Sequence, residues 1–506
     1  MESTSFITVE NLTKRFGPVL ANDALSLRIR RGEIHCLLGE NGAGKTTLAE
    51  CLYGFHRPDS GEIRCEGRPV SFESPRDAIE KGIGMVHQHF VLIRSFSVLE
   101  NVALTAQKRG MLLDLSQIGR ELKSLCREYH VDLDLKAAVW QLSVGEQQWV
   151  EILKALFVGA ELLILDEPTA VLTPQETERL FAVLRQMKSE GLSILLITHK
   201  LGEVMRVADR ISVLRDGRLV DTVAVGEVDK QDLAHMMVGR EVVLQVEREN
   251  GAAGAPLLEV DNLRVVDDRD RVAVRDVSFT LHSGEILGLA GVAGNGQREL
   301  FEALIGVRRP MGGQVRFEGE DITNSRPRDI QRRGIAHVPD DRMHQGVVGD
   351  LSVADNLILG RQRATRYRRG PLLDRSRIGS AARDLIDTFA IMTPSLNQKV
   401  RFLSGGNLQK VILARELGDN PGCLLANQPT RGLDVGVIEY VHTQLLEMRR
   451  SGAAVLLISE DLDELFGLSD RIMIMFEGAI MGVVDPKATS VEEVGLMMAG
   501  IRDEPR

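Results

Sequence analysis

Short runs of apolar residues recur along the chain and are separated by longer amphipathic stretches. Residues 34–38, 162–165, 194–197 and 455–458 are such runs, rich in leucine and β-branched side chains. Runs of this length are typical of strands that are buried on both faces of a parallel sheet, whereas residues 175–188 place their apolar side chains at helical spacing. The pattern predicts an α/β fold in which helices cover buried parallel strands.

The pattern of the first half returns in the second half. Matching segments stand in the same order: 9–12 with 260–263, 31–34 with 283–286, and 97–101 with 352–356. Glycine-rich loops begin at residues 39 and 291, 252 positions apart, and Leu-Ser motifs begin at 142 and 403, 261 positions apart, so the second half carries nine extra residues between them. Such a repeat indicates two homologous domains. We expect a first domain at 1–246, a polar, Gly- and Pro-containing linker at 247–256, and a second domain at 257–506.

Size and composition exclude several classes of protein. The 506 residues allow two domains with large cores. The five cysteines form no Cys-x-x-Cys motif, which favours reduced thiols in the cytoplasm over disulfides or a metal site. No apolar run approaches the ~18 residues of a membrane span, and the N-terminus does not resemble a signal peptide. A net charge of −10 argues against general nucleic-acid binding, although a local basic patch is compatible with it.

Residues 39–47 follow the first apolar run and fit the pattern Gly-x-x-x-x-Gly-Lys-Ser/Thr of a phosphate-binding loop. Glycines let successive backbone N–H groups turn towards a β-phosphate, and the following helix presents its positive end. Lys45 is expected beside the β and γ oxygens, and Thr46 on a magnesium ion. The residues expected to bind a nucleoside triphosphate here are Gly39, Glu40, Asn41, Gly42, Ala43, Gly44, Lys45, Thr46 and Thr47.

Two carboxylates, Asp166 and Glu167, end another apolar run. The carboxyl end of a parallel strand lies beside the phosphate loop, so we expect Asp166 to hold magnesium and Glu167 to polarise the attacking water. Three further residues are weaker candidates when taken alone. His199 ends a strand and can hydrogen-bond a γ-phosphate, Gln88 offers an amide to magnesium or the water, and Phe16 offers a ring to adenine.

Residues 403–407, Leu-Ser-Gly-Gly-Asn, make the chain resemble the ATP-binding subunits of ABC transporters, in the fused two-domain form of simple-sugar and nucleoside importers. The resemblance covers nearly the whole chain. It implies two tandem phosphate-loop (RecA-like) ABC ATPase domains, each with a helical subdomain and a β subdomain, arranged as a head-to-tail pseudo-dimer. In this arrangement the ATP held by one domain's loop is capped by the other domain's signature. The capping residues would be Ser404, Gly405, Gly406 and Asn407.

Each composite site would combine the phosphate loop of one domain with the signature of the other. The departures from the family pattern fall on one of these two sites. The other site is complete and joins the first-half residues to 403–407 and 431–434. The degenerate site has Gln297 and Arg298 in its loop, Asp340 for Gln88, Asn427 and Gln428 for the carboxylates, Glu460 for His199, and Val144, Glu146 and Thr173 facing them. Amides keep the shape of carboxylates without the charge, so magnesium binding and water activation are lost. We expect one hydrolytic site per chain.

The resemblance also implies partners. Closure on ATP and reopening after hydrolysis would drive two integral-membrane permease subunits, with the chain peripheral on the cytoplasmic face of the cell membrane. Segments 88–141 and 340–402 would form helical subdomains that contact the permeases. The basic run 361–370 touches lipid headgroups or an acidic partner loop, or is a solvated charged face, which we favour. An extracytoplasmic substrate-binding (lipo)protein would be an indirect partner, and no nucleic acid is expected.

The transported molecule does not contact this subunit, so its class is inferred from short sequence motifs. Residues 84–90, 170–176, 198–201, 290–297 and 338–342 resemble the nucleoside-import branch, whereas the sugar branch more often reads Ser-Ala-Leu-Thr and Ser-His-Arg at two of these places. We predict nucleosides, with a monosaccharide (ribose, xylose or a galactoside) as the alternative. A soluble twin-cassette ATPase acting on ribosomes or DNA is an alternative from another class. Such proteins usually keep two competent sites and carry a long charged linker or zinc modules, and this sequence has neither feature. A purely structural role is opposed by the complete first site.

Overall fold

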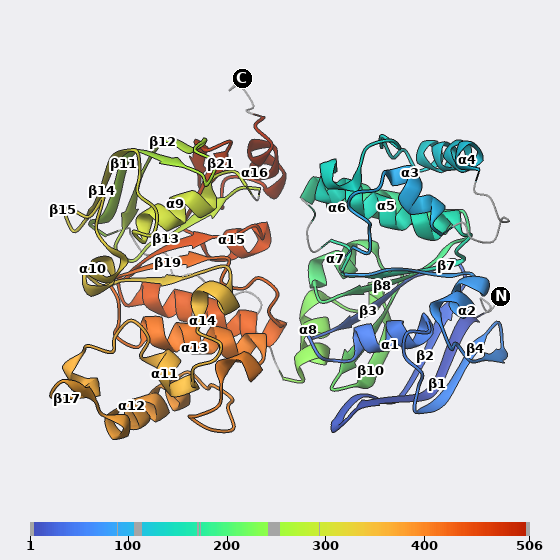
Figure 1. Cartoon of the computed structure of the whole chain (residues 1–506), viewed down its shortest axis with the longest axis horizontal. Coiled ribbons are helices and arrows are strands. Elements are labelled where there is room, and N and C mark those ends of the chain that lie inside the picture. The colour runs from blue at the N-terminus through green and yellow to red at the C-terminus, as the bar shows by residue number, and fades with distance from the viewer. Residues whose placement is uncertain are drawn as a thin grey trace. The chain divides into compact units, whose positions relative to one another are not determined.

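The computed structural model of the chain describes residues 5–88, 90–105, 114–169, 172, 174–240, 254–292 and 294–501. The chain folds into two compact units, Met1–Val242 and Val243–Arg506 (Figure 1). Residues 247–253 of the predicted linker lie outside the described residues. Each unit is an α/β structure that is built from a six-stranded sheet and a four-stranded sheet.

In the first unit the six-stranded sheet has the order β10-β9-β3-β8-β7-β6, and the four-stranded sheet has the order β2-β1-β4-β5. The strands are β1 (Ser5–Phe16), β2 (Val19–Arg30), β3 (Ile34–Gly39), β4 (Ser60–Cys65), β5 (Arg68–Val70), β6 (Ile83–Val86), β7 (Leu162–Asp166), β8 (Ser193–Thr198), β9 (Arg210–Arg215) and β10 (Arg218–Ala224). The α-helices are α1 (Lys45–Leu52), α2 (Pro75–Glu80), α3 (Val98–Ala103), α4 (Leu115–Glu128), α5 (Val144–Phe157), α6 (Pro174–Ser189), α7 (Leu201–Val207) and α8 (Lys230–Val238). Within this unit α3, α4 and α5 lie on one side of the larger sheet, and β1, β2 and β4 lie on the other (Figure 1).

The second unit repeats this plan, with sheets in the orders β16-β19-β20-β13-β21-β22 and β12-β11-β14-β15. Its strands are β11 (Pro256–Val266), β12 (Val272–His282), β13 (Ile286–Ala290), β14 (Gly312–Phe317), β15 (Glu320–Asp321), β16 (Ile335–Val338), β17 (Arg368–Arg369), β18 (Leu372–Leu373), β19 (Cys423–Asn427), β20 (Ala454–Ile458), β21 (Arg471–Phe476) and β22 (Ala479–Val484). Its α-helices are α9 (Gln297–Leu304), α10 (Pro327–Arg332), α11 (Val353–Leu357), α12 (Arg375–Thr388), α13 (Gly405–Leu417), α14 (Val435–Arg450), α15 (Leu462–Leu468) and α16 (Val491–Met498). The short hairpin β17–β18 begins in the basic run 361–370 and ends just after it.

The central strands of both larger sheets are buried, as their apolar runs predict. Every residue of β3, β7, β8 and β20 is buried, and β3 pairs in parallel with β8, which pairs in parallel with β7. This confirms the prediction of buried parallel strands. Because neighbouring parallel strands end at the same edge of a sheet, the loops after β3, β7 and β8 meet there. That edge carries the phosphate loop, the acidic pair and His199.

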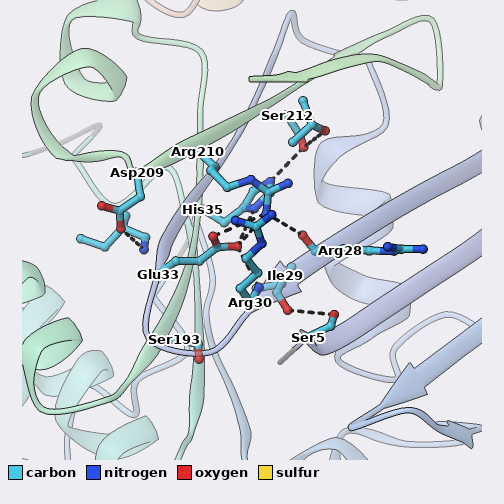
Figure 2. A network of polar contacts seen from close by, with 12 residues as sticks. Ser5, Arg28, Ile29, Arg30, Glu33, His35, Ser193, Asp209, Arg210 and Ser212 are labelled. Atoms are coloured by element: carbon cyan, nitrogen blue, oxygen red, sulfur yellow. Dashed lines mark hydrogen bonds and ion pairs between the residues drawn. The ribbon is translucent and has the colours of Figure 1, made fainter. Parts of the chain in front are cut away.

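A polar network closes the opposite end of β3, where the strand begins (Figure 2). His35 is fully buried; its Nδ1 lies 3.1 Å from Oε1 of Glu33 and its Nε2 lies 2.9 Å from Oγ of Ser212. Arg210 donates to the same Glu33 oxygen at 3.2 Å. Burial lowers the pKa of His35, outweighing the opposite influence of Glu33. The neutral ring therefore donates from Nδ1 to Glu33 and accepts at Nε2 from the serine hydroxyl, which links β3 to β9.

Folding stability is expected to fall in mild acid because of His35. In the unfolded chain the imidazole of His35 binds a proton as the pH falls below about 6.5, whereas in the folded chain it stays neutral. The free energy of unfolding therefore decreases as the pH drops below that value. The expected loss from this residue is ~1.4 kcal/mol per pH unit. Urea unfolding of the parent and of His35→Leu, measured between pH 5 and 8, checks this. Leucine is the chosen replacement because Leu287 fills the matching position of the second half. Equal pH dependence in the two proteins would contradict the prediction.

Candidate active site

The phosphate loop connects β3 to α1, and its backbone demands glycine at the start of the helix. Gly44 has a φ of 95°, in the left-handed region, and a Cβ built on it would lie 2.3 Å from the carbonyl oxygen of Ala21. The buried side chain of Asn22 donates to the Gly44 carbonyl at 3.0 Å. Conformation and space together exclude a side chain here, so the loop keeps its shape. Its N–H groups precede a helix start, which suits an anionic ligand.

Lys45 lies at the base of this loop with 6% of its surface exposed. Its Nζ donates to the carbonyl oxygens of Gly39, at 2.7 Å, and of Glu40, at 2.9 Å. These bonds fold the side chain back over the loop that it follows. The ammonium charge favours the ionised forms of Asp166 and Glu167, although burial outweighs this influence on the pKa of Asp166.

Asp166 ends β7 and accepts a hydrogen bond from the hydroxyl of Thr46 at 2.9 Å. Burial raises the pKa of Asp166 to about 6, the Thr46 hydrogen bond opposes the rise, and the charge of Glu167 adds to it. A buried carboxylate with its charge only partly compensated, next to a hydroxyl, is a donor set that fits magnesium. The described residues contain no group of three or more His, Cys, Asp or Glu side chains that could hold a metal ion.

Glu167 is held between His199 and Gln88. Its Oε1 lies 2.8 Å from Nδ1 of His199, and its Oε2 accepts from Nε2 of Gln88 at 3.1 Å. Burial raises its pKa, but the hydrogen bond and charge of His199, with Lys45 adding to them, hold the pKa below its usual value. Its φ of 47° is a strained conformation for this residue type, as is common at functional sites. The structure therefore brings the predicted base, its two partners and the Asp166–Thr46 pair to one edge of the sheet.

Phe16 and the second-half signature, residues 403–407, have contacts within their own units. Phe16 ends β1, where its exposed ring meets His56 edge-on with 5.0 Å between centroids. Ser404 caps α13, and its Oγ accepts from the side-chain amide of Asn407 at 3.0 Å. A Cβ on Gly406 would lie 2.7 Å from Val437, so this glycine lets α13 and α14 approach. Adenine stacking by Phe16 and capping of ATP by the signature stay predictions.

The first-half signature, residues 142–146, carries a carboxylate in the first turn of its helix. Ser143 caps α5 and forms a capping box with Glu146, whose Oε2 accepts from the Ser143 N–H at 2.7 Å. Glu146 stands where the second half has Asn407, and Val144 stands where it has Gly405. A negative charge therefore occupies the start of α5, whereas the start of α13 carries a neutral amide. This contrast opposes anion binding at the first signature.

The second-half loop keeps the backbone of the first without its chemistry. Gln297 replaces the lysine and donates to the Val292 carbonyl at 3.0 Å, while Arg298 pairs with Glu302 at 2.8 Å. Gln428 has a φ of 50°, matching that of Glu167, and its Oε1 accepts from the N–H of Glu460 at 3.4 Å. The buried Asn427 ends β19 in place of the aspartate. Thr173, which was expected to face this loop, lies outside the described residues.

A buried glutamate that the sequence reasoning missed supports the catalytic edge. Glu203 in α7 is 4% exposed; it accepts from Oγ1 of Thr169 at 2.7 Å and from Oγ1 of Thr198 at 3.4 Å. These threonines stand close in sequence to the base and to its histidine partner, so Glu203 ties the two segments together. Glu464 has the same place in the second unit and accepts from Thr430 at 2.7 Å. Its recurrence 261 positions later is the signal that could have found it.

The basic run is partly neutralised within the second unit. Arg361 and Arg366 both pair with Asp419, with nitrogen–oxygen distances of 2.8 and 2.6 Å. Arg368 donates to the carbonyl of Pro371 at 2.8 Å across the hairpin. Within the part of the chain that the structure describes, none of the helices combines the length and the apolar character needed to cross a membrane.

Comparison with known proteins agrees with the geometry. The family model described as ABC transporter matches residues 22–170 and 274–431. A glucose import ATP-binding protein of Haloferax volcanii is 45% identical, over 99% of this chain and 96% of its own. A nucleoside import ATP-binding protein of Lactococcus lactis is 43% identical, over 99% of both chains, and a guanosine import ATP-binding protein of Bacillus subtilis is 44% identical, over 98% of this chain and 97% of its own. A solved archaeal ribosome recycling factor, bound to a ribosomal stalk protein, covers 94% of this chain and 90% of its own with a TM-score of 0.64; at 18% identity it shows the fold alone.

Proposed function

We propose that this chain, which belongs to the ABC transporter family, is the ATP-hydrolysing subunit of an importer for nucleosides. Its membership makes it an ABC-type ATPase and the ATP-binding subunit of an importer. The observation that carries the catalytic assignment is the placement of Glu167, held at 2.8 Å by His199 and at 3.1 Å by Gln88. The substrate, the site residues and the partners are the finer parts of this proposal.

The residues of the first unit divide the work of hydrolysis. Lys45 and the loop N–H groups bind the β- and γ-phosphates. Thr46 and Asp166 would hold a magnesium ion, which when bound neutralises charge on the phosphate oxygens. Glu167, ionised because His199 and Lys45 hold its pKa low, takes a proton from the attacking water. His199 and Gln88 fix the direction of its two oxygens.

The second unit contributes its signature, residues 403–407, to the ATP site of the first unit. Ser404 and the N–H groups that begin α13 cap the γ-phosphate, and the first-half signature, closed by Glu146, faces the degenerate loop. ATP then holds the two units together in a head-to-tail arrangement, and hydrolysis releases them. A pair of permease subunits converts this motion into transport, with the chain peripheral on the cytoplasmic face and a substrate-binding (lipo)protein on the other side. The support for the asymmetry is that Gln297, Asn427 and Gln428 remove the cation, the metal ligand and the base.

The sequences of several short segments, including residues 84–90 and 198–201, favour nucleosides as the substrate. The relatives described above are named for the import of nucleosides, guanosine or glucose, and their identities to this chain are similar. Overall identity therefore does not separate nucleosides from sugars, and a monosaccharide importer is the second candidate.

Uptake of labelled compounds tests the proposal. A strain that lacks the gene for this chain should lose uptake of guanosine and adenosine, and the parent chain should restore it while Glu167→Gln should not. Ribose, glucose and galactose uptake serve as controls. Loss of monosaccharide uptake alone would contradict the nucleoside proposal and support a monosaccharide as the transported molecule. Unchanged uptake of all these compounds, with the chain absent from membranes that contain its permeases, would overturn the importer assignment itself.

A further inference from the structure

A pocket of about 400 Å³ opens at the start of α13, in the second unit. Arg342, Gly405 and Arg431 line it, together with Asp340 and Asp341. Arg342 follows β16, Gly405 is the first residue of α13, and Arg431 follows β19 by four residues. Two guanidinium groups therefore flank the first turn of a helix that begins with the second-half signature.

The position of Arg342 is fixed by neighbours that carry no charge. Its Nε donates to Oε1 of the buried Gln409 at 2.8 Å, and its Nη2 donates to the backbone carbonyl of Arg431. Its remaining nitrogen, Nη1, faces the start of the helix, since a Cβ built on Gly405 would lie 3.9 Å from it. Two hydrogen bonds thus orient the guanidinium and leave one edge directed at the signature.

Neither arginine of the pair forms an ion pair within the described residues. Among the described residues, neither Arg342 nor Arg431 has a carboxylate oxygen within 4.0 Å, although two aspartates line the same pocket. The carboxylate of Asp341 accepts from the His344 N–H at 2.9 Å and lies 2.8 Å from the His344 ring. Burial and the charge of Arg431 lower the pKa of Arg342 to about 10, so it stays protonated at neutral pH. Two guanidinium groups that form no ion pair and lie together beside a helix N-terminus favour an anionic ligand.

The arginine pair, Arg342 and Arg431, occurs only on the side of the near-intact signature. The matching positions of the first half hold Phe90 and Ala170. There the helix start also carries Glu146, which would repel an anion. The cations thus accompany the signature that keeps Ser-Gly-Gly and are absent beside the one that has lost it.

We propose that the arginine pair binds the γ-phosphoryl group of ATP, together with Ser404 and the N–H groups that begin α13. This inference rests on the proposed function, because it requires the nucleotide on the first-unit loop to meet the second-unit signature. It adds two phosphate-binding cations to the signature side. ADP has no γ-phosphoryl group, so the pair should act on ATP and be indifferent to ADP.

Equilibrium binding of Mg-ATP and Mg-ADP to the full-length chain tests this, in a Glu167→Gln background that prevents turnover. Arg342→Gln and Arg431→Gln should each lower the preference for ATP over ADP by about 10-fold or more, as expected for loss of a charged hydrogen bond, with ADP affinity unchanged. Arg342→Lys, which keeps the charge, should restore part of the preference. Arg363→Gln, an exposed arginine of the same unit, is the control for net charge and should match the background.

The outcomes separate the two proposals. An unchanged ATP preference in both arginine variants would overturn the inference, and so would equal weakening of ATP and ADP, which indicates a structural role. Arg431→Gln is the safer variant because the bond from Arg342 goes to the backbone of residue 431, which the substitution retains. A background chain that binds neither nucleotide would instead overturn the proposed function, and this inference with it.

Discussion

Replacing Glu167 by glutamine is expected to lower ATP hydrolysis by ~10²–10⁴-fold, the usual contribution of a general base, while ATP binding is retained. Glutamine keeps the shape of the side chain and cannot accept the proton of the attacking water. The backbone tolerates the change, because Gln428 adopts a φ of 50° at the matching position of the second unit, against 47° for Glu167. Steady-state phosphate release and equilibrium ATP binding measure the two quantities.

The mirror variant, Gln428→Glu, is the matched control. It restores a carboxylate to the second unit, but Gln297 and Asn427 still lack the cation and the metal ligand, so the rate should stay at the parent value. A doubled rate would show that the second loop is latent and still competent. Turnover near the parent rate in Glu167→Gln would remove Glu167 from its role as the base.

The parts of the fold that the sequence predicts best are those with local signals. The apolar runs at 162–165 and 194–197 lack alternation, and the structure buries them as the parallel strands β7 and β8. Residues that end such strands must then meet at one edge, which is why the sequence alone predicts that Asp166 and His199 lie close together. The match between the two halves added the signature and the lost residues of the second loop.

The parts that could not be predicted depend on contacts between distant segments. Glu203 meets Thr169 across 34 positions, and Arg342 meets Gln409 across 67. No periodicity or spacing encodes such meetings, because they follow from how helices pack on the sheet. The raised pKa of Asp166 depends in the same way on how deeply the finished fold buries it. The sequence therefore offered Glu167, His199 and Gln88 as candidates, and offered no signal for the contacts of Glu203 or Arg342.

Ser404→Arg is expected to abolish ATP hydrolysis even though Ser404 and Glu167 belong to different units. If Ser404 and the start of α13 cap the γ-phosphate held by Lys45, a long cation in its place displaces that contact and blocks closure. The structure supplies a matched control in Ser143→Arg. Both serines are N-caps, Ser404 accepting from the N–H of Asn407 and Ser143 from that of Glu146, so each substitution should cost the fold a similar ~1 kcal/mol.

Any difference in turnover between these two variants therefore reports on the ligand and not on helix stability. Ser143 caps the helix whose first turn already carries Glu146, a charge that opposes phosphate binding, so its replacement should mainly slow closure. ATPase measured in membranes that also contain the permeases should rank the parent first, Ser143→Arg second and Ser404→Arg last, with the last near zero. The reverse order would mean that the Lys45 loop is capped by the first-half signature of another chain, and that two copies of the chain share each site.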